Sequence, residues 1–415
     1  MLNQKVLMFV ENHFPYDFRV RNEAYTLTKE GYRVTVISYK NEGDKTFEIV
    51  NGVYVYRIPR IKLFKKNKRE ESSFLQKIFP RIKSVVEYIF EYIYFTFVCF
   101  IMSLHLALKE GVDIFHAHNP PDTLFLIGAF YKLFGKKFVF DHHDLSPELY
   151  LTRFSGKKDI IYKILILLEK LSCRLADVII CTNNSYKQIV MNRHNINANN
   201  IYIVRNNPVF SEFLTSYKAG YNQTKKETDK KILLYLGSIN PQDSVDLLLH
   251  SLHYLVNDLN EKNIICYLIG DGDSLQSVKK VANELCLMDY VEFKGFISER
   301  EKIIEYLSLS DICIEPASDN ELNRHSTFIK IMEYMAVGKP IVAYDLTETR
   351  YSANGGAILV PPGDIKAFAK GIKQLVDNSQ LRRNISKAGL ERIEKELNWE
   401  KGSLNLIGAY KALSF

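Results

Sequence analysis

The segment His325–Pro340, HSTFIKIMEYMAVGKP, places a lysine and a glutamate where they could bind a phosphate and a ribose. Ser326 or Thr327 is a good helix N-cap, and the closing Gly-Lys-Pro predicts the end of the helix. Lys330 and Glu333 then share one helix face. The free N–H groups at a helix start bind anions, Lys330 adds positive charge, and Glu333 can accept two hydroxyl hydrogen bonds. A capped surface helix with an intrahelical Lys–Glu pair is the alternative.

A second polar group, the DHHD segment at residues 141–144, follows a predicted strand. A metal site is one interpretation, because His and Asp are metal ligands. Against it, adjacent residues of an extended segment alternate faces, and no third cluster completes a ligand shell. His116 and His118 lie near the end of the preceding predicted strand and Asn119 follows it, so they would border the same space. For His116, a structural role at the end of the sheet is the alternative.

Two series of apolar runs, separated by helical patterns, must position these side chains. The first series is 5–10, 32–38, 53–58, 113–118, 137–141, 177–182 and 201–205, and the second is 231–237, 263–270, 290–295, 311–316, 340–345 and 357–361. Such alternation indicates parallel sheets covered on both faces. Residues 213–230 lose apolar periodicity, as a linker does. We therefore expect two doubly wound α/β domains facing across a cleft, 1–212 and 231–395, with ligands at the carboxyl ends of the strands.

Composition excludes several classes of partner and cofactor. The 415 residues carry a formal net charge of +7, but ten basic and only two acidic residues lie between Arg57 and Lys83, so the rest of the chain is nearly neutral. A nucleic-acid partner is therefore not expected. No G-x-G-x-x-G follows a predicted strand, which argues against a nicotinamide dinucleotide. Six widely spaced cysteines indicate buried thiols in a reducing compartment, and we expect a cytoplasmic protein.

The basic segment interleaves cations with apolar residues, a pattern that suits an anionic membrane surface. Its central cations are Lys65, Lys66, Lys68 and Arg69. Each cation near an anionic leaflet contributes about 1 kcal/mol, and the apolar side chains can enter the interface. A solvated loop is the alternative. Residues Tyr92–Leu108 lack charged side chains over 17 positions, fewer than the roughly 20 of a membrane span, so we expect a buried or membrane-touching helix.

Over nearly its whole length, the chain resembles the family 4 glycosyltransferases, which are retaining enzymes of the GT-B fold. The resembling segments are FPYDFRVRNEAYTL (14–27), DIFHAHNPPD (113–122), FDHHDLSPE (140–148), LYLGSINPQDSVDLLL (234–249), IGDGDS (269–274), STFIKIMEYMAVGKPIVAYDLTETR (326–350) and NWEKGSLNLIGAY (398–410). The resemblance implies metal-independent sugar transfer from a nucleotide diphosphate donor, without a cofactor. It also implies an acceptor-binding N-terminal domain, a nucleotide-binding C-terminal domain, and a last helix, 396–415, that packs back on the N-terminal domain.

The sequence departs from this family at the expected donor site. The usual Glu-x7-Glu pair has His325 in its first position and keeps Glu333 in its second. The loop that commonly reads G-R-x-x-x-x-K-G begins at Gly237 and lacks both cations. About two positive partners are needed to neutralise two phosphates in a cleft. The candidate replacements are Lys330, Arg324 and Arg19.

The resemblance assigns roles to individual residues. His143 and Asp144, with His118 beside them, line the acceptor side near the reacting carbon and are the candidate catalytic residues. The expected donor-binding residues are Glu333, Lys330, Thr327, Ser326, Arg324, His325, Arg19 and Gly237. Asp271-Gly272-Asp273 matches the Asp-x-Asp metal motif of GT-A transferases, but a tight turn after a strand of the second domain is the favoured interpretation. We expect no metal site.

We interpret the chain as a retaining glycosyltransferase of cell-surface polysaccharide assembly at the inner face of the cytoplasmic membrane. It would move a sugar from a nucleotide diphosphate donor to a glycan or lipid-linked acceptor. No carboxylate nucleophile stands out, so front-face attack, in which the departing diphosphate takes the acceptor's proton, is the expected mechanism. Two alternatives remain: a nucleotide-sugar epimerase of GT-B fold, and a non-catalytic GT-B scaffold.

Overall fold

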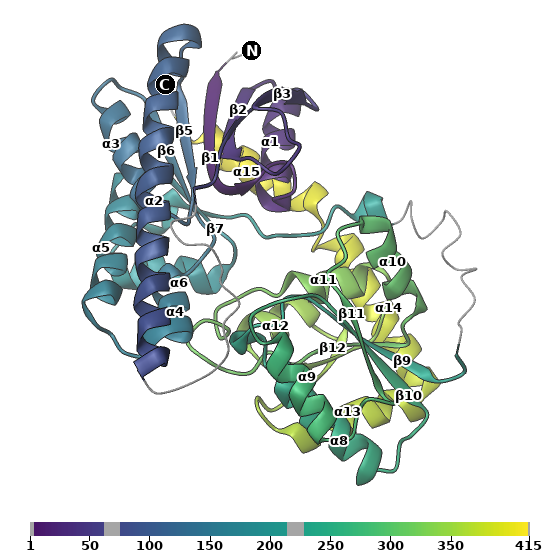
Figure 1. The fold of residues 1–415 in the computed structure, drawn as a ribbon. Helices are drawn as coiled ribbons and strands as arrows, with labels where there is room; N and C mark the ends of the chain where they lie inside the picture. Colours follow the sequence, from purple (N-terminus) through teal and green to yellow (C-terminus); the bar gives the residue numbers. More distant parts are fainter. Residues whose placement is uncertain (1–3, 62–74, 214–227, 414–415) are drawn as a thin grey trace. The chain divides into compact units, whose positions relative to one another are not determined.

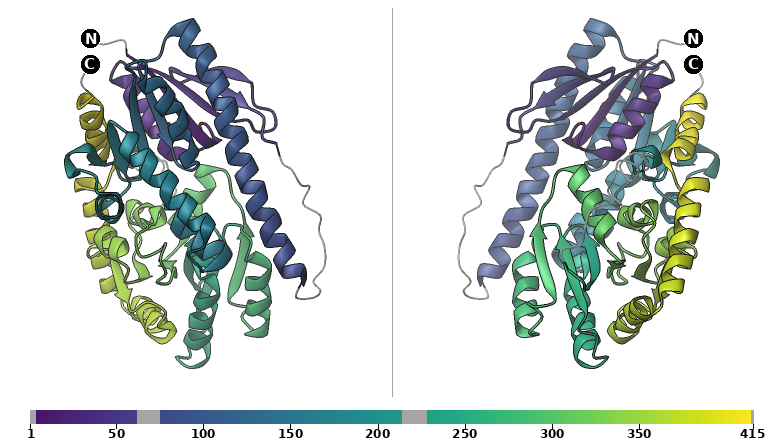
Figure 2. Two further views of the ribbon diagram at one scale, coloured as in Figure 1. Left: turned by 90° about the vertical axis from the view of Figure 1, so that its left-hand side faces the viewer. Right: turned by 90° about the vertical axis from the view of Figure 1, so that its right-hand side faces the viewer.

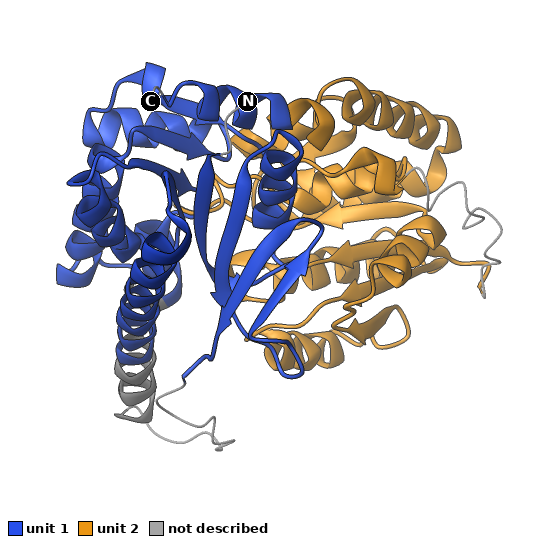
Figure 3. Cartoon of the chain, turned by 90° about the horizontal axis from the view of Figure 1, so that it is seen from above, with its two compact units in different colours: residues 1–205, 403–415 blue, residues 206–402 orange. Residues whose placement is uncertain are grey.

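The computed structural model describes residues 4–61, 75–213 and 228–413, without the side chains of 75–85 and 154–155. It forms two compact units (Figure 3). Unit 1 contains residues 1–205 and 403–415, and unit 2 contains residues 206–402. Most of the predicted linker, 213–230, lies outside the described residues.

Unit 1 is built on an eight-stranded sheet with the order β3-β4-β2-β1-β5-β6-β7-β8 (Figure 1). Its strands are β1 (Lys5–His13), β2 (Arg33–Tyr39), β3 (Phe47–Val50), β4 (Val53–Ile58), β5 (Ile114–His118), β6 (Lys137–His142), β7 (Val178–Cys181) and β8 (Ile201–Ile203). All neighbours pair in parallel except β3 and β4, which are antiparallel. The central strands are buried almost throughout, because helices cover both faces of a parallel sheet.

The helices of unit 1 are α1 (Phe18–Lys29), α2 (Leu75–Glu110), α3 (Phe125–Lys132), α4 (Ser146–Tyr150), α5 (Ile160–Leu175) and α6 (Asn184–His194), with the short helix η1 (Asp122–Leu124) before α3. Helices α1, α5 and α6 each begin at a side-chain N-cap. Asp17 caps α1 by accepting from the Val20 N–H at 3.0 Å. The predicted helix at 92–108 is the C-terminal half of α2.

Unit 2 repeats the architecture with six parallel strands in the order β11-β10-β9-β12-β13-β14. They are β9 (Lys231–Leu236), β10 (Ile264–Ile269), β11 (Val291–Gly295), β12 (Ile312–Glu315), β13 (Ile341–Tyr344) and β14 (Ala357–Val360). The helices are α8 (Val245–Asn257), α9 (Leu275–Glu284), α10 (Arg300–Leu309), α11 (Ile329–Ala336), α12 (Thr347–Ala353), α13 (Ile365–Asp377) and α14 (Ser379–Lys395). Helix α15 (Trp399–Lys411) begins in unit 2 and ends in unit 1.

The predicted fold class, two doubly wound α/β domains, is confirmed, and each predicted strand overlaps an observed one. Strand β3 was not predicted. It is half-exposed and pairs with β4 through a two-residue hairpin at Asn51-Gly52, where both residues have positive φ (48° and 83°). Asn-Gly is the usual signal for such a turn, so this short strand could have been identified from the dipeptide.

A tight helix–sheet contact generates a stability prediction. A Cβ at Gly128 of α3 would lie 2.5 Å from the Phe138 ring of β6, so Gly128→Ala overpacks the core. We expect a loss of about 1–3 kcal/mol in the free energy of unfolding, measured by chemical denaturation.

Gly408→Ala in α15 is the matched control, since no heavy atom lies within 4 Å of its added Cβ. Because glycine inside a helix is less favourable than alanine, this variant should be more stable than the wild type by about 0.5–1 kcal/mol. Equal stability of the two variants would contradict the tight contact.

Candidate active site

The carboxyl ends of β5 and β6 bring the predicted polar residues of unit 1 together. His118 and Asp141 are paired directly across the two strands. His116 lies two residues earlier on the same face, and its ring stacks on that of His118 with centroids 4.1 Å apart. His142 points to the other face and meets Glu169 of α5 at 3.0 Å. The expected alternation of faces along the DHHD segment is therefore observed.

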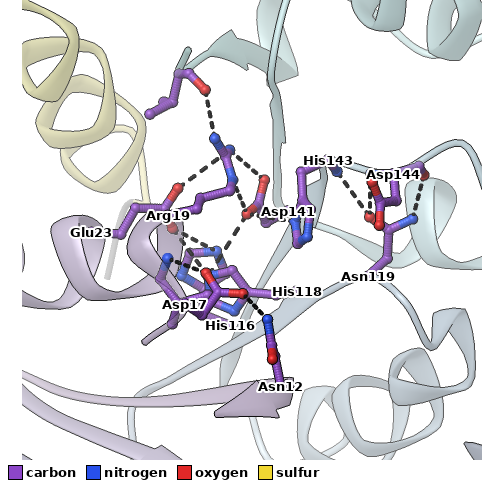
Figure 4. A network of polar contacts seen from close by, with 12 residues as sticks. Asn12, Asp17, Arg19, Glu23, His116, His118, Asn119, Asp141, His143 and Asp144 are labelled. Atoms are coloured by element: carbon purple, nitrogen blue, oxygen red, sulfur yellow. Dashed lines mark hydrogen bonds and ion pairs between the residues drawn. The ribbon is translucent and has the colours of Figure 1, made fainter. Parts of the chain in front are cut away.

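Arg19 of α1 is the cation at the centre of this group (Figure 4). Its Nε and Nη2 donate to the two carboxylate oxygens of Asp141, both at 2.6 Å, and Nη1 donates to the Val204 carbonyl at 2.9 Å. Nη2 also lies 3.3 Å from Glu23. The arginine is 5% exposed. We expected Arg19 to bind a donor diphosphate; the structure instead commits it to two buried carboxylates, which need a cation in an apolar interior.

His143 and Asp144 lie just beyond β6, at the surface of the same network. His143 Nδ1 is 3.1 Å from Asp141, and its side chain is 17% exposed. Burial lowers the pKa of the His143 imidazole, but the Asp141 carboxylate outweighs burial and raises that pKa above its usual value. Asn119 shapes the loop, because its Oδ1 accepts from the backbone N–H groups of His143 and Asp144. His143 is thus a partly exposed group with a raised pKa, held on a fixed backbone.

His118 and His116 lie deeper and have partners inside the protein. His118 Nδ1 is 3.1 Å from the Phe9 carbonyl, and its Nε2 is 3.0 Å from Glu23. His116 Nδ1 is 2.8 Å from the hydroxyl of Tyr410 in α15. Burial lowers the pKa of His116 well below its usual value, so its ring is neutral and can accept this hydrogen bond. His118 was predicted to be catalytic, but its full burial fits a positioning role better.

No third group that could complete a metal-ligand shell was evident in the sequence, but the structure contains a cluster of four potential ligands. Glu23, His116, His118 and Asp141 place one potential ligand atom each within 4.8 Å of one another, a cluster that sequence spacing did not reveal. Arg19, however, contacts both carboxylates of this cluster. Its guanidinium supplies the positive charge that they need, which disfavours a second cation at the same position.

In unit 2, Lys330 of α11 lies at the carboxyl ends of β9 and β12. Its Nζ is 2.8 Å from Glu315 and 3.2 Å from the Tyr235 hydroxyl. Burial lowers the pKa of Lys330, but the Glu315 carboxylate outweighs burial and raises it, so the lysine stays charged. Gly237 follows β9 with φ +152°, and a Cβ there would lie 2.8 Å from Nζ. Lys330 and Gly237, two of the predicted donor-binding residues, are therefore neighbours, and the lysine already has a buried acidic partner.

Glu333 lies one turn further along α11 and is bound by a residue that the sequence did not single out. Arg300 Nη1 of α10 donates to its Oε1 at 2.8 Å. Their side chains are 34% and 12% exposed, so the pair reaches solvent. A polar ligand can therefore compete for the Glu333 carboxylate.

The segment before α11 differs from the prediction. The helix begins at Ile329 with Phe328 at the N-cap position, so neither Ser326 nor Thr327 is the N-cap. Ser326 Oγ instead donates to the Leu322 carbonyl at 2.8 Å. His325 donates its backbone N–H to the same carbonyl at 3.2 Å, in the turn before the helix. Arg324 is exposed and pairs with Asp319 at 3.1 Å.

The Asp271-Gly272-Asp273 segment forms a turn against the loop after β9. The Asp273 N–H donates to Asn240 Oδ1 at 2.9 Å, and a Cβ at Gly272 would lie 2.4 Å from the Ile239 carbonyl oxygen. The segment thus forms the tight turn that was preferred over the metal motif.

The predicted membrane-binding cations Lys65, Lys66, Lys68 and Arg69 lie outside the described residues. Two other cations of the basic segment are neutralised. Arg57 is buried and pairs with Glu48 at 2.6 Å, and Arg60 hydrogen-bonds to Glu91 of α2. The segment therefore offers less free charge than its composition indicated.

Sequence reasoning missed the partners that hold the predicted residues, namely Glu23, Glu315, Arg300, Tyr235 and Tyr410. For Glu315 a signal existed, because an acid that ends an otherwise apolar strand needs a buried cation nearby. The other partners come from sequence-distant elements, and their local patterns are those of ordinary helices and strands.

Comparison with known proteins agrees with this arrangement. Residues 19–206 match a family model described as glycosyltransferase family 4, and residues 217–392 match one described as glycosyl transferases group 1. A chitobiosyldiphosphodolichol beta-mannosyltransferase of Candida glabrata is 21% identical over 95% of this chain and 88% of its own length.

Two solved structures share the fold of the whole chain. Sucrose-phosphate synthase of Thermosynechococcus elongatus superposes with a TM-score of 0.74 at 18% identity, covering 99% of both chains. Anabaena HepE in complex with UDP and glucose superposes with a TM-score of 0.71 at 14% identity, covering 99% of this chain and 100% of HepE.

The Asp141–His143 contact predicts a pH-dependent stability. A histidine whose folded pKa is raised contributes stability that is fully present below its unfolded pKa of about 6.5 and is lost as pH rises through the folded value. Replacing His143 by Gln should remove this contribution. The free energy of unfolding of the wild type should therefore fall more steeply than that of His143→Gln as pH rises from about 6.5.

Denaturant titrations at several pH values measure this difference, and NMR titration of the ring gives the folded pKa. His105→Gln on the exposed face of α2 controls for the loss of an imidazole as such. Parallel pH profiles for the wild type and His143→Gln would contradict the assigned protonation of His143.

Proposed function

Because the chain belongs to the family 4 glycosyltransferases and has their GT-B fold, we propose that it transfers a sugar from a nucleotide diphosphate donor to a lipid-linked acceptor. The observation that carries this proposal is the Lys330 and Glu333 pair on α11, beside the glycine loop after β9. The pair puts a positive charge and a hydroxyl acceptor one turn apart at the carboxyl end of a parallel sheet, where such folds bind nucleotides.

The donor half of the site belongs to unit 2. The Glu333 carboxylate accepts hydrogen bonds from the ribose hydroxyls after Arg300 releases the carboxylate oxygen to which it donates. Lys330 lies beside Gly237, whose lack of a side chain lets a phosphate approach the backbone. The HepE structure, which contains UDP and glucose, supports a nucleotide-sugar donor by analogy of fold.

The acceptor half belongs to unit 1. His143 and Asp144 are the partly exposed polar groups at the sheet end there, held by Asp141 and Asn119. The dolichol-linked diphosphate in the name of the Candida relative supports a lipid-linked acceptor. With such an acceptor, the enzyme works at a membrane surface. We propose that this surface is the inner face of the cytoplasmic membrane and that the reaction belongs to surface-polysaccharide assembly.

The proposed chemistry needs no metal and retains the anomeric configuration. The acceptor hydroxyl attacks from the face that the diphosphate leaves, and the leaving phosphate oxygen takes its proton. The protein then has to stabilise negative charge on the departing diphosphate, which is the task of Lys330. His143 and Asp144 orient the acceptor hydroxyl and the sugar.

Donor binding tests the role of Glu333. We expect Glu333→Ala to weaken the binding of the true nucleotide sugar at least about tenfold, because one hydrogen bond to a charged group contributes about 1.5–3 kcal/mol. A thermal-shift screen of nucleotide sugars identifies the donor, and calorimetric titration measures the change. Glu301→Ala, an exposed acid in the first turn of α10, is the control and should bind normally. Unchanged nucleotide-sugar binding by Glu333→Ala would show that Glu333 does not bind the ribose.

Turnover tests the role of Lys330. Lys330→Met should lower kcat/KM by roughly 10²–10³, the range seen when one charge-stabilising donor is removed. The single variant also leaves Glu315 buried without a cation, which destabilises the fold. The double variant Lys330→Met with Glu315→Gln should recover thermal stability but not turnover. If turnover returned together with stability, Lys330 would be a structural residue and the phosphate assignment would be wrong.

A further inference from the structure

One side of unit 1 exposes an unusual number of large apolar side chains. Helix α2 exposes Ile89, Ile93, Phe97 and Ile101 at intervals of four residues, with exposures of 47%, 60%, 62% and 49%. These positions lie along one side of the helix. Contiguous apolar surface of this kind marks a site that meets a membrane or another protein.

The two neighbouring helices continue this surface. Leu126 of α3 is exposed, as are Leu133 and Phe134 just after the helix, with Leu133 at 82%. Helix α5 exposes Ile160, Ile164, Leu167 and Leu171. The α5 positions recur at helical spacing. Phe100 of α2 packs edge-on against Phe130 of α3, and α3 packs on α5. In Figure 2, α2 and α5 both lie on the side of unit 1 that faces the viewer in the left panel.

Between α2 and α3 this surface is hollowed into a groove of about 440 Å³. Its walls are Ile93, Phe97 and Phe100 of α2 and Leu126, Ile127 and Phe130 of α3. Among the described residues that line it, Thr96 and Thr123 contribute hydroxyls, which lie 2.6 Å apart and hydrogen-bond to each other. The groove therefore offers a hydrocarbon-like lining to a ligand, and its size falls in the range of about 300–1,000 Å³ that small-molecule sites have.

Helix α2 is anchored to unit 1 along its inner face. The stretch Val86–Glu110 is long and apolar enough to cross a bilayer by length and composition, but 33% of its most apolar window is buried inside the protein. Phe95 and Cys99 are fully buried, and the Phe95 ring packs on Tyr39 of β2 at 5.0 Å. Ser103 is also fully buried and contacts the Tyr131 hydroxyl of α3 at 3.1 Å. A helix held in this way presents one side to a bilayer and lies along its surface.

The charges on α5 favour an anionic bilayer over a second protein copy. Lys163 and Arg174 are exposed on the helix, and Lys158 is exposed just before it. The acids of the same segment are occupied: Asp159 caps α5, and Glu169 is buried against His142 and Arg193. An apolar side flanked by cations, without an exposed acid among the described residues 156–175, is the pattern of a helix that lies in an anionic interface.

We propose that the apolar side formed by α2, α3 and α5 inserts into one leaflet of an anionic lipid bilayer, with a hydrocarbon chain of a bilayer lipid in the α2–α3 groove. The inference deepens the proposed function and rests on it for one point, that the acceptor is reached at this surface. It adds α3 and α5 of unit 1 to the membrane contact that the sequence predicted for the basic segment 57–83 and for the apolar helix at 92–108.

Depth-dependent quenching tests the proposal on the full-length protein. Phe97→Trp places a fluorophore at the groove, and Met288→Trp places one at an exposed position of unit 2 as a matched control. The single native tryptophan, Trp399, is 7% exposed and gives a constant background. With vesicles of phosphatidylcholine and phosphatidylglycerol brominated in the acyl chains, we expect strong quenching and a blue shift at position 97 but neither at position 288.

Vesicle sedimentation gives a second readout. The variant with Ile93→Ser and Phe97→Ser should bind the same vesicles at least tenfold more weakly, whereas Met288→Ser should bind like the wild type. Both serine substitutions in the pair are at exposed positions, so folding should be retained, and circular dichroism checks it.

Three outcomes would overturn the proposal. The protein could sediment with vesicles while position 97 stays unquenched, which would assign the contact to another surface. It could fail to bind vesicles altogether. Position 97 could be shielded without vesicles in a concentration-dependent dimer, which would assign this side to a second copy of the chain. The Glu333→Ala variant separates this proposal from the proposed function, because it should lose donor binding and keep vesicle binding.

Discussion

In each unit of this protein, a buried acid at the carboxyl end of the parallel sheet is held by a cation from a helix. In unit 1 the Arg19 guanidinium holds Asp141 through two hydrogen bonds of 2.6 Å, and in unit 2 Lys330 holds Glu315 at 2.8 Å. A buried charge that loses its partner costs about 3–5 kcal/mol, so neither pair can be broken cheaply. In both units the cation comes from a helix and the acid from a strand end. The two pairs therefore fix helix against sheet where polar ligands meet α/β folds.

The more exposed candidate residues, His143 and Glu333, lie next to these pairs in contact or along the same helix. His143 hydrogen-bonds to Asp141, and its protonation follows from that carboxylate. Glu333 lies one turn along α11 from Lys330 and shares its carboxylate with Arg300. The buried pairs thus set the position and charge of groups that remain reachable. The loop after β9 lacks the arginine and lysine that are common in the family. The Glu315 partner nevertheless keeps Lys330 charged beside Gly237.

The sequence predicted the fold better than the contacts within the candidate site. Apolar runs and helix signals are local, so the strands and their alternation with helices could be predicted from the sequence. Among the described strands, the half-exposed β3 was not predicted. The polar groups at 116–119, 141–144 and 325–333 were found because they follow strands or begin a helix. Arg19 was predicted to bind the donor diphosphate, whereas the structure pairs it with Asp141 and Glu23. An arginine fork suits a phosphate and a carboxylate equally, so the sequence alone did not reveal these partners. The capping of α11 was also wrong, because Ser326 bonds backward to Leu322 and the helix starts later.

Sugar transfer with retention to a lipid-linked acceptor can be tested by analysis of the reaction product. The full-length protein would be incubated with its identified nucleotide sugar and membranes that carry lipid-linked acceptors, and the organic-soluble product would be analysed by NMR at the new anomeric carbon. We expect a lipid-extractable product with the same anomeric configuration as the donor. An inverted product, a free or epimerised sugar, or donor binding without any product would contradict it.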